Sequence, residues 1–189
     1  MVMSHIEEIV GGKLAWTEVD LLDIDDTSAR PIRDALEEFG IRVNYHPIGQ
    51  PRHMTAVLGG ARPVAPYVLL CCHGEDGRIL LPELGGEIAA EQPFNGSMGP
   101  KRVRKHLRLP GSAVISTGCG TGKPALAQAF LDAGASAYFA PAEPPDGHSA
   151  FFAVLQLFYE LTAGRDLRQA AHRVRAYGDE FDIWELRER

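Results

Sequence analysis

The chain has 189 residues, of which 45% are apolar and 23% charged, the proportions of one soluble globular domain over residues 1–189. A formal net charge of −6 argues against nucleic acid or an anionic membrane as a partner. The basic run KRVRKHLR (101–108) is the local exception, and its simplest interpretation is an exposed short helix.

Neither a membrane span nor a secretory signal is expected. No stretch approaches the roughly 18 consecutive apolar residues of a transmembrane helix, and the start MVMSHIEEIV lacks a basic-then-apolar order. Three cysteines, with Cys71 and Cys72 adjacent, make a poor disulfide framework and leave a free thiol. A reducing, cytoplasmic location is therefore expected.

Strand-like and helix-like periodicities alternate through the first part of the chain, which predicts an α/β layered fold. Asp26 and Thr27 are candidate N-caps for the first helix, and Gly40 ends it. The expected order is a strand at 15–24, a helix at 28–40, a strand at 41–48, a Gly/Pro-rich connection at 49–66 and a buried strand at 67–72.

The second part continues the alternation after an irregular stretch at 75–112, where GRILLPEL reads as a hairpin arm and GPKRVRKHLRL as a short helix. Pro124 suits the first position of a helix, and Asp166 suits an N-cap. The expected elements are strands at 112–116, 136–140 and 181–186 and helices at 124–134, 150–164 and 167–177.

A glycine-rich loop follows the strand at 112–116, in VISTGCGTGKPALAQAF (114–130). A phosphate-binding P-loop requires G-x-x-x-x-G-K-[ST], but Thr117 stands at the first glycine and Pro124 at the hydroxyl position. A dinucleotide G-x-G-x-x-G pattern fails at Lys123. Nucleotide binding therefore remains an alternative that the templates do not favour.

The same loop suits a nucleophile. Cys119 lies between two glycines shortly before a helix, where backbone N–H groups favour a thiolate and its own N–H can face an oxyanion. His73 and Gly74 end the strand at 67–72 in the same way. If the two strands are parallel neighbours, both ends open on one sheet edge, so that His73 faces Cys119 and Gly74 supplies a second oxyanion N–H. Taken singly, Cys119 is better explained as a core-packing residue and His73 as an ordinary loop residue.

These motifs together resemble the caspase-like cysteine peptidase clan, and most closely its CHAT branch, related to separase. The resemblance rests on HG after an apolar strand, VISTGCGTG and LAQAFLDAGASAYFA, and it covers residues 67–175. It implies a three-layer α/β/α sandwich with a mostly parallel central sheet. It also implies a bacterial-type cysteine peptidase with Cys119 as nucleophile, His73 as its partner, and Gly74 and Cys119 N–H groups as oxyanion hole.

The resemblance further places an acidic residue in the loop after the strand at 136–140, where it recognises a basic P1 side chain. Asp146 in APAEPPDGHSAFF holds that position, with Glu143 and His148 as lesser candidates. An N-cap or turn role for Asp146 is the alternative. Ala142 departs from the family's tryptophan before this loop.

The implied chemistry is peptide-bond hydrolysis without cofactor or metal, on a protein or peptide substrate, with a recruiting partner or a second copy as the expected associate. A catalytically inactive scaffold of the same fold is the rival. The aspartates at 20, 23, 25 and 26 resemble a metal cluster, but Asp25 and Asp26 read better as the cap of the first helix.

Overall fold

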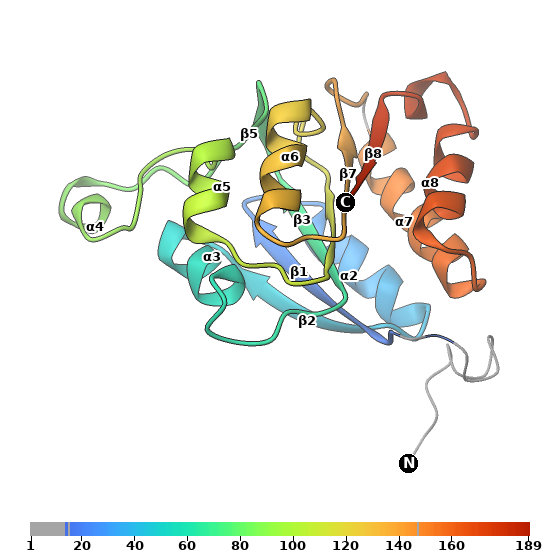
Figure 1. Cartoon of the computed structure of the whole chain (residues 1–189), viewed down its shortest axis with the longest axis horizontal. Helices are drawn as coiled ribbons and strands as arrows, with labels where there is room; N and C mark the ends of the chain where they lie inside the picture. The colour runs from blue at the N-terminus through green and yellow to red at the C-terminus, as the bar shows by residue number, and fades with distance from the viewer. Residues whose placement is uncertain (1–13, 15, 147) are drawn as a thin grey trace, which may run out of the picture.

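A six-stranded sheet with the order β2-β1-β3-β6-β7-β8 forms the centre of the molecule (Figure 1). The computed structural model describes residues 14, 16–146 and 148–189. All pairings are parallel except that of the last strand, which runs antiparallel to its neighbour. The strands are β1 (Glu18–Ile24), β2 (Arg42–Pro47), β3 (Tyr67–Cys72), β6 (Ala113–Ser116), β7 (Ala137–Pro141) and β8 (Trp184–Glu188).

Helices cover both faces of this sheet, which confirms the predicted three-layer α/β/α sandwich (Figure 1). One face carries α3 (Pro51–Leu58), α5 (Pro100–His106) and α6 (Pro124–Asp132). The other carries α2 (Ala29–Glu38), α7 (Ser149–Thr162) and α8 (Leu167–Arg175). The short elements are β4 (Gly74–Glu75), β5 (Arg78–Ile79), α4 (Gly86–Ala90) and the 3-10 turn η1 (Asp179–Phe181).

The central strand β3 shows why its sequence is continuously apolar. Leu70 and Cys72 pack into the cluster under α3, α5 and α6, while Leu69 and Cys71 pack into the cluster under α2, α7 and α8. Successive side chains point to opposite faces of a strand, so a strand covered on both faces needs apolar residues at every position. The prediction of a doubly covered strand at 67–72 is confirmed.

The connection predicted at 49–66 was wrong over its first half, because it contains α3. Glycines and prolines at its borders obscured the helical spacing of its apolar residues. Pro51 occupies the first turn, where its missing N–H costs nothing, and Met54, Val57 and Leu58 form an i, i+3, i+4 stripe buried against the sheet. Gly59 then ends the helix.

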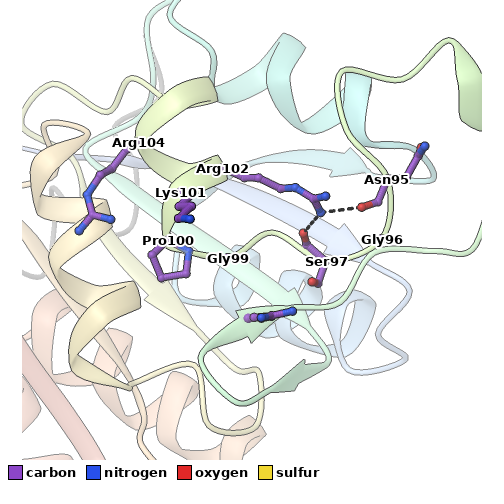
Figure 2. Close-up of a pocket in the computed structure, with 9 residues that line it drawn as sticks. Asn95, Gly96, Ser97, Gly99, Pro100, Lys101, Arg102 and Arg104 are labelled. Atoms are coloured by element: carbon purple, nitrogen blue, oxygen red, sulfur yellow. Dashed lines mark hydrogen bonds between the residues drawn. The ribbon is translucent and has the colours of Figure 1, made fainter.

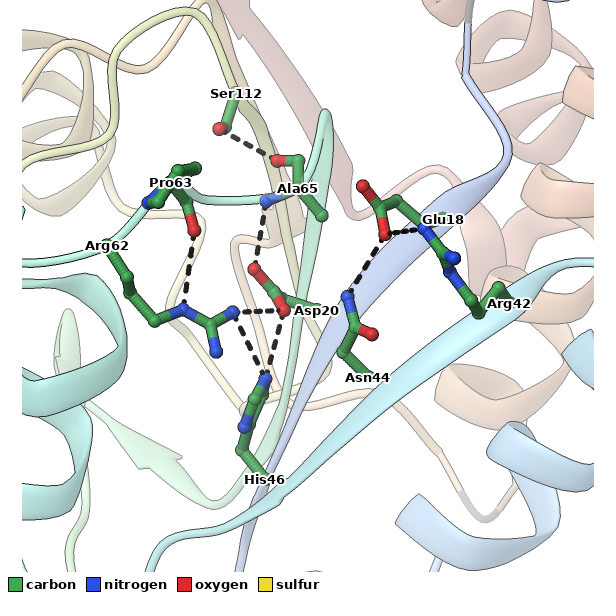
Figure 3. Close-up of polar contacts among 9 residues, drawn as sticks. All are labelled: Glu18, Asp20, Arg42, Asn44, His46, Arg62, Pro63, Ala65 and Ser112. Atoms are coloured by element: carbon green, nitrogen blue, oxygen red, sulfur yellow. Dashed lines mark hydrogen bonds and ion pairs between the residues drawn. The ribbon is translucent and has the colours of Figure 1, made fainter.

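A buried carboxylate ties three segments together at the β2 edge (Figure 3). Asp20 on β1 is fully buried and accepts hydrogen bonds from His46 Nε2 at 2.9 Å, Arg62 Nη2 at 2.6 Å and the Ala65 N–H at 2.9 Å. Burial opposes ionisation, but the hydrogen bonds from His46, Ala65 and Arg62 outweigh it and lower the pKa of Asp20 to about 2. Asp20 therefore holds the segment that leads into β3.

The longest described helix, α7, has 14 residues, and within the described ranges no helix is both long and apolar enough for a bilayer crossing.

Candidate active site

The loops that carry His73 and Cys119 leave the same edge of the sheet. Strands β3 and β6 are parallel neighbours, as the sequence predicted, and Leu70 stands opposite Ser116 in their register. Each candidate residue lies three positions beyond this register pair (73 − 70 and 119 − 116). His73 is exposed and Cys119 is half-buried, so both reach solvent at the carboxyl edge where open parallel sheets bind ligands.

Gly74 lies directly against the backbone of the cysteine loop. A Cβ at this position would come within 2.5 Å of both the Cys119 carbonyl oxygen and Thr121 Cγ2, and one at Gly118 would lie 3.3 Å from the Gly74 nitrogen. Real side chains do not make such contacts, so glycine is required at both positions. The close approach fixes the His73–Gly74 turn against the segment that presents Cys119.

The Gly74 N–H takes no part in the hairpin formed by β4 and β5. Ile79 lies opposite Gly74, but its N–H and its carbonyl both form hydrogen bonds with the backbone of Met98. The Leu80 N–H donates to the His73 carbonyl at 2.9 Å. Gly74 is thus a non-hydrogen-bonded member of the antiparallel pair, and its N–H points away from β5. Asp76 (φ 46°) and Gly77 (φ 70°) supply the two positive φ angles of a tight hairpin turn.

The N–H groups of the glycine-rich loop are mostly engaged within the protein. Gly118 donates to Ser116 Oγ, Gly120 to the Glu143 carbonyl, Thr121 to the Gly118 carbonyl and Gly122 to the Pro141 carbonyl. Between residues 118 and 122, only the Cys119 N–H has no acceptor among the described residues. This arrangement leaves one donor for an oxyanion and too few for a phosphate cradle.

Buried hydroxyls hold the loop in this conformation. Ser116 Oγ and Thr121 Oγ1 lie 2.9 Å apart, and Thr121 Oγ1 donates to the Gly118 carbonyl at 2.7 Å. Thr117 Oγ1 accepts from the Cys72 N–H at 3.1 Å and contacts Asp26 Oδ2 at 3.3 Å. The loop is therefore braced from β3 and from the end of β1 while the Cys119 side chain stays accessible.

The other two cysteines are packing residues, as predicted. Cys71 and Cys72 are buried, and burial raises the pKa of both thiols, that of Cys72 to about 12. Thiols held in the neutral form are poor nucleophiles. Cys119 is the one cysteine of the three that is not buried.

A cavity of about 550 Å³ opens beside Cys119. Carboxylates dominate its charge, with three acidic residues against the single cation Lys123. It is lined from the hairpin, from the cysteine loop and from the segment after β7, by Gly74, Glu75, Asp76, Leu80, Cys119, Gly120, Lys123, Ala142, Glu143 and Pro144. The acidic lining suits a basic side chain placed next to Cys119.

A second acidic cavity of about 500 Å³ lies at the carboxyl end of β1, next to β3. Asp23, Asp25 and Asp26 line it together with Arg30. Asp25 has a left-handed backbone (φ 57°), unusual for a residue other than glycine. Asp26 accepts from the Ser28 N–H at 2.9 Å, but Ser28, and neither Asp26 nor Thr27, is the N-cap of α2, so the predicted cap position was wrong.

The sequence interpretation missed the lining role of Asp25 and Asp26 in this cavity and of Glu75 and Asp76 in the cavity beside Cys119. The available signal was their position immediately after β1 and β3, because the ends of neighbouring parallel strands share one edge. Within residues 14, 16–146 and 148–189, no three His, Cys, Asp or Glu side chains form a metal-binding group. Asp20 instead binds Arg62 and His46, and Asp23 binds the Tyr45 hydroxyl.

Asp146 lies on the exposed loop before α7 and is not among the residues lining either acidic cavity. Its backbone carbonyl accepts from the Ser149 N–H at 2.9 Å, while His148 is the N-cap of α7. Of the two lesser candidates, Glu143 lines the cavity beside Cys119 and His148 does not. The P1 role of Asp146 stays a prediction.

No family model and no curated protein matches this sequence. Among solved structures, a chain of the separase–securin complex of Saccharomyces cerevisiae superposes with a TM-score of 0.56 at 9% identity, over 97% of this chain and 13% of that one. A secreted C11 cysteine protease of Bacteroides thetaiotaomicron, solved with an irreversible peptide inhibitor, gives 0.47 at 10% identity over 92% and 66%. The chain has a caspase-like fold, as its motifs predicted.

Proposed function

We propose that the chain is a cysteine endopeptidase in which Cys119 and His73 form the catalytic dyad. The observation that carries this proposal is the contact between the two strand ends. Gly74 packs against the Cys119 carbonyl. His73, the neighbour of Gly74 in sequence, is thereby held close to the backbone of Cys119. The accessible Cys119 side chain and its unengaged N–H complete the set of groups that acyl transfer requires.

The reaction proceeds through a thioester. His73 takes the thiol proton, and the Cys119 sulfur attacks the scissile carbonyl carbon to form a C–S bond. The Gly74 and Cys119 N–H groups stabilise the resulting oxyanion. His73 returns the proton to the amide nitrogen, the C–N bond breaks, and the amine leaves. Water, deprotonated by His73, then attacks the thioester, so that the acid and the free thiol are released.

The substrate is a protein or peptide with Lys or Arg at P1. Three carboxylates beside Cys119 support this specificity. Their negative charges and hydrogen bonds offset the free energy that a Lys or Arg side chain loses when it leaves water. We further propose that the protein acts in the cytoplasm. A recruiting partner or a second copy of the chain brings it to its substrate.

Neutralising the lining acids is expected to reduce the preference for a charged P1 residue. In the double variant Asp76→Asn/Glu143→Gln, kcat/KM for a P1-arginine peptide should fall about 10–100-fold, because charge-assisted hydrogen bonds are worth about 1.5–3 kcal/mol. Cleavage of the matched P1-citrulline peptide, which is neutral, should change little. Asp146→Asn is measured in parallel, and a selective loss in that variant alone would assign P1 recognition to Asp146 instead.

Selective labelling of Cys119 tests the nucleophile directly. A peptidyl acyloxymethyl ketone with lysine at P1 should modify Cys119 in the folded protein and leave Cys71 and Cys72 unmodified, as read by peptide mass spectrometry. His73→Ala should slow the labelling about 100-fold, the usual contribution of a general base. As a control, the denatured protein is labelled with iodoacetamide, which shows whether all three cysteines are detectable.

Two outcomes would overturn the proposal in favour of a rival. Absence of labelling at Cys119, together with absence of cleavage of basic peptides, would identify an inactive scaffold. Stabilisation by ATP or GTP with Mg²⁺ in a thermal shift, lost in Lys123→Ala, would identify a nucleotide-binding protein.

A further inference from the structure

A basic cavity of about 710 Å³ is lined by Arg78 of the β4–β5 hairpin and by residues between 95 and 104 (Figure 2). Four of its lining residues are cations, Arg78, Lys101, Arg102 and Arg104, and none is acidic. The whole chain carries a net charge of −6, so this concentration of positive charge is local. Most of it comes from the basic run singled out in the sequence.

The charge of one of these cations is already neutralised. Arg104 Nε donates to Asp132 Oδ2 on α6 at 2.7 Å, and its side chain points toward that helix (Figure 2). Arg78 and Lys101 form no ion pair with any described residue. The Arg78 stem lies over Gly99, where a Cβ would be 3.5 Å from its Cγ.

Arg102 is held in place without being neutralised. Its Nη1 donates to the carbonyl oxygens of Asn95, at 2.5 Å, and Ser97 (Figure 2). Its guanidinium lies 5.2 Å from the centre of the Phe94 ring. Both interactions orient the guanidinium, yet neither partner carries a negative charge. The Nε and Nη2 donors remain for a ligand, because arginine has five N–H groups.

We propose that this basic cavity is a binding site for a small polyphosphate, a compound with at least two linked phosphoryl groups. Three cations without a carboxylate partner, one of them fixed in orientation, match the charge and the oxygen geometry of such a ligand. The volume is that of a small-molecule site. The net charge of −6 on the whole chain opposes an extended polyanion, which favours a compact ligand.

Isothermal titration calorimetry of inorganic pyrophosphate into the full chain tests this proposal. Mg²⁺ is left out, and NaCl keeps the ionic strength constant within each titration. The wild type should bind saturably at one site, and affinity should fall at least tenfold in Arg78→Gln/Lys101→Gln. The double variant Lys105→Gln/Arg175→Gln removes two exposed cations from outside the cavity and should bind within twofold of the wild type. Raising NaCl from about 50 to about 500 mM should weaken binding, because salt screens exposed charges.

Several results would overturn the proposal. Pyrophosphate fails as a ligand if no saturable heat appears, or if both double variants lose affinity equally. Saturable binding of a hexaglutamate peptide without binding of pyrophosphate would assign the cavity to an acidic peptide. Because the assay measures binding and not cleavage, its result is independent of the proposed peptidase activity.

Discussion

Cys119→Ala is expected to reduce cleavage of a P1-arginine peptide to the uncatalysed background, a loss of about 10⁴-fold or more in kcat/KM. The reason is that the acyl intermediate needs the sulfur, and no other cysteine is accessible. His73→Ala should cost about 10²–10⁴-fold, the range of a general acid–base group. Initial rates with a fluorogenic peptide, measured from low to saturating substrate, provide the comparison.

The controls for these variants use residues that lie elsewhere. His172→Ala removes an exposed histidine from α8 and should leave kcat/KM unchanged. His73 is exposed and Cys119 half-buried, so thermal unfolding of both variants should stay close to that of the wild type. Retention of full activity in Cys119→Ala would mean that another residue is the nucleophile.

Asp20→Asn is expected to lower the free energy of unfolding by about 2 kcal/mol at pH 7, because the neutral amide cannot form the ion pair with Arg62 and weakens the hydrogen bonds that the carboxylate accepts from His46 and Ala65. The effect depends on pH with a defined sign. The pKa of Asp20 falls from 3.8 to about 2 on folding, so its stabilisation is complete above about pH 4 and is lost as the pH falls toward 2. The difference between wild type and variant should therefore shrink in acid.

Urea unfolding at a series of pH values from 7 to 2 measures this difference. Asp34→Asn, an exposed acid on α2, is the matched control and should follow the wild type at every pH. A difference between wild type and Asp20→Asn that stays constant down to pH 2 would show that the carboxylate contributes packing rather than charge.

Most of the fold could be predicted because its strands are buried on both faces. The run at 67–72 has an apolar residue at every position, and helices such as α8 begin at a clear N-cap, where Asp166 accepts from the Gln169 N–H at 2.8 Å. The helix α3 was missed because its stripe of three apolar residues lies between glycines and prolines that dominate the local composition.

The position of the candidate dyad could be predicted for a different reason. Parallel strands place their carboxyl ends at one edge, so two short motifs far apart in sequence, CCHG and TGCGTG, converge once the strand order is known. The contribution of the loop after β7 to the acidic lining could not be predicted in this way. Whether Glu143 or Asp146 faces Cys119 depends on how the loop after β7 turns, and no periodic pattern encodes that turn.

The glycines around Cys119 have a consequence for how relatives of this chain should be interpreted. A Cβ at Gly122 would lie 2.5 Å from the Ala140 carbonyl oxygen, and one at Gly118 would lie 2.9 Å from the Cys72 sulfur. Packing alone therefore excludes other residues there, so natural selection for folding would preserve this glycine pattern even in a lineage that had stopped cleaving peptides. The exposed His73 and the half-buried Cys119 are under no such packing constraint. Under the proposed function these two positions, and not the glycines between and after them, are therefore the diagnostic of activity across homologues.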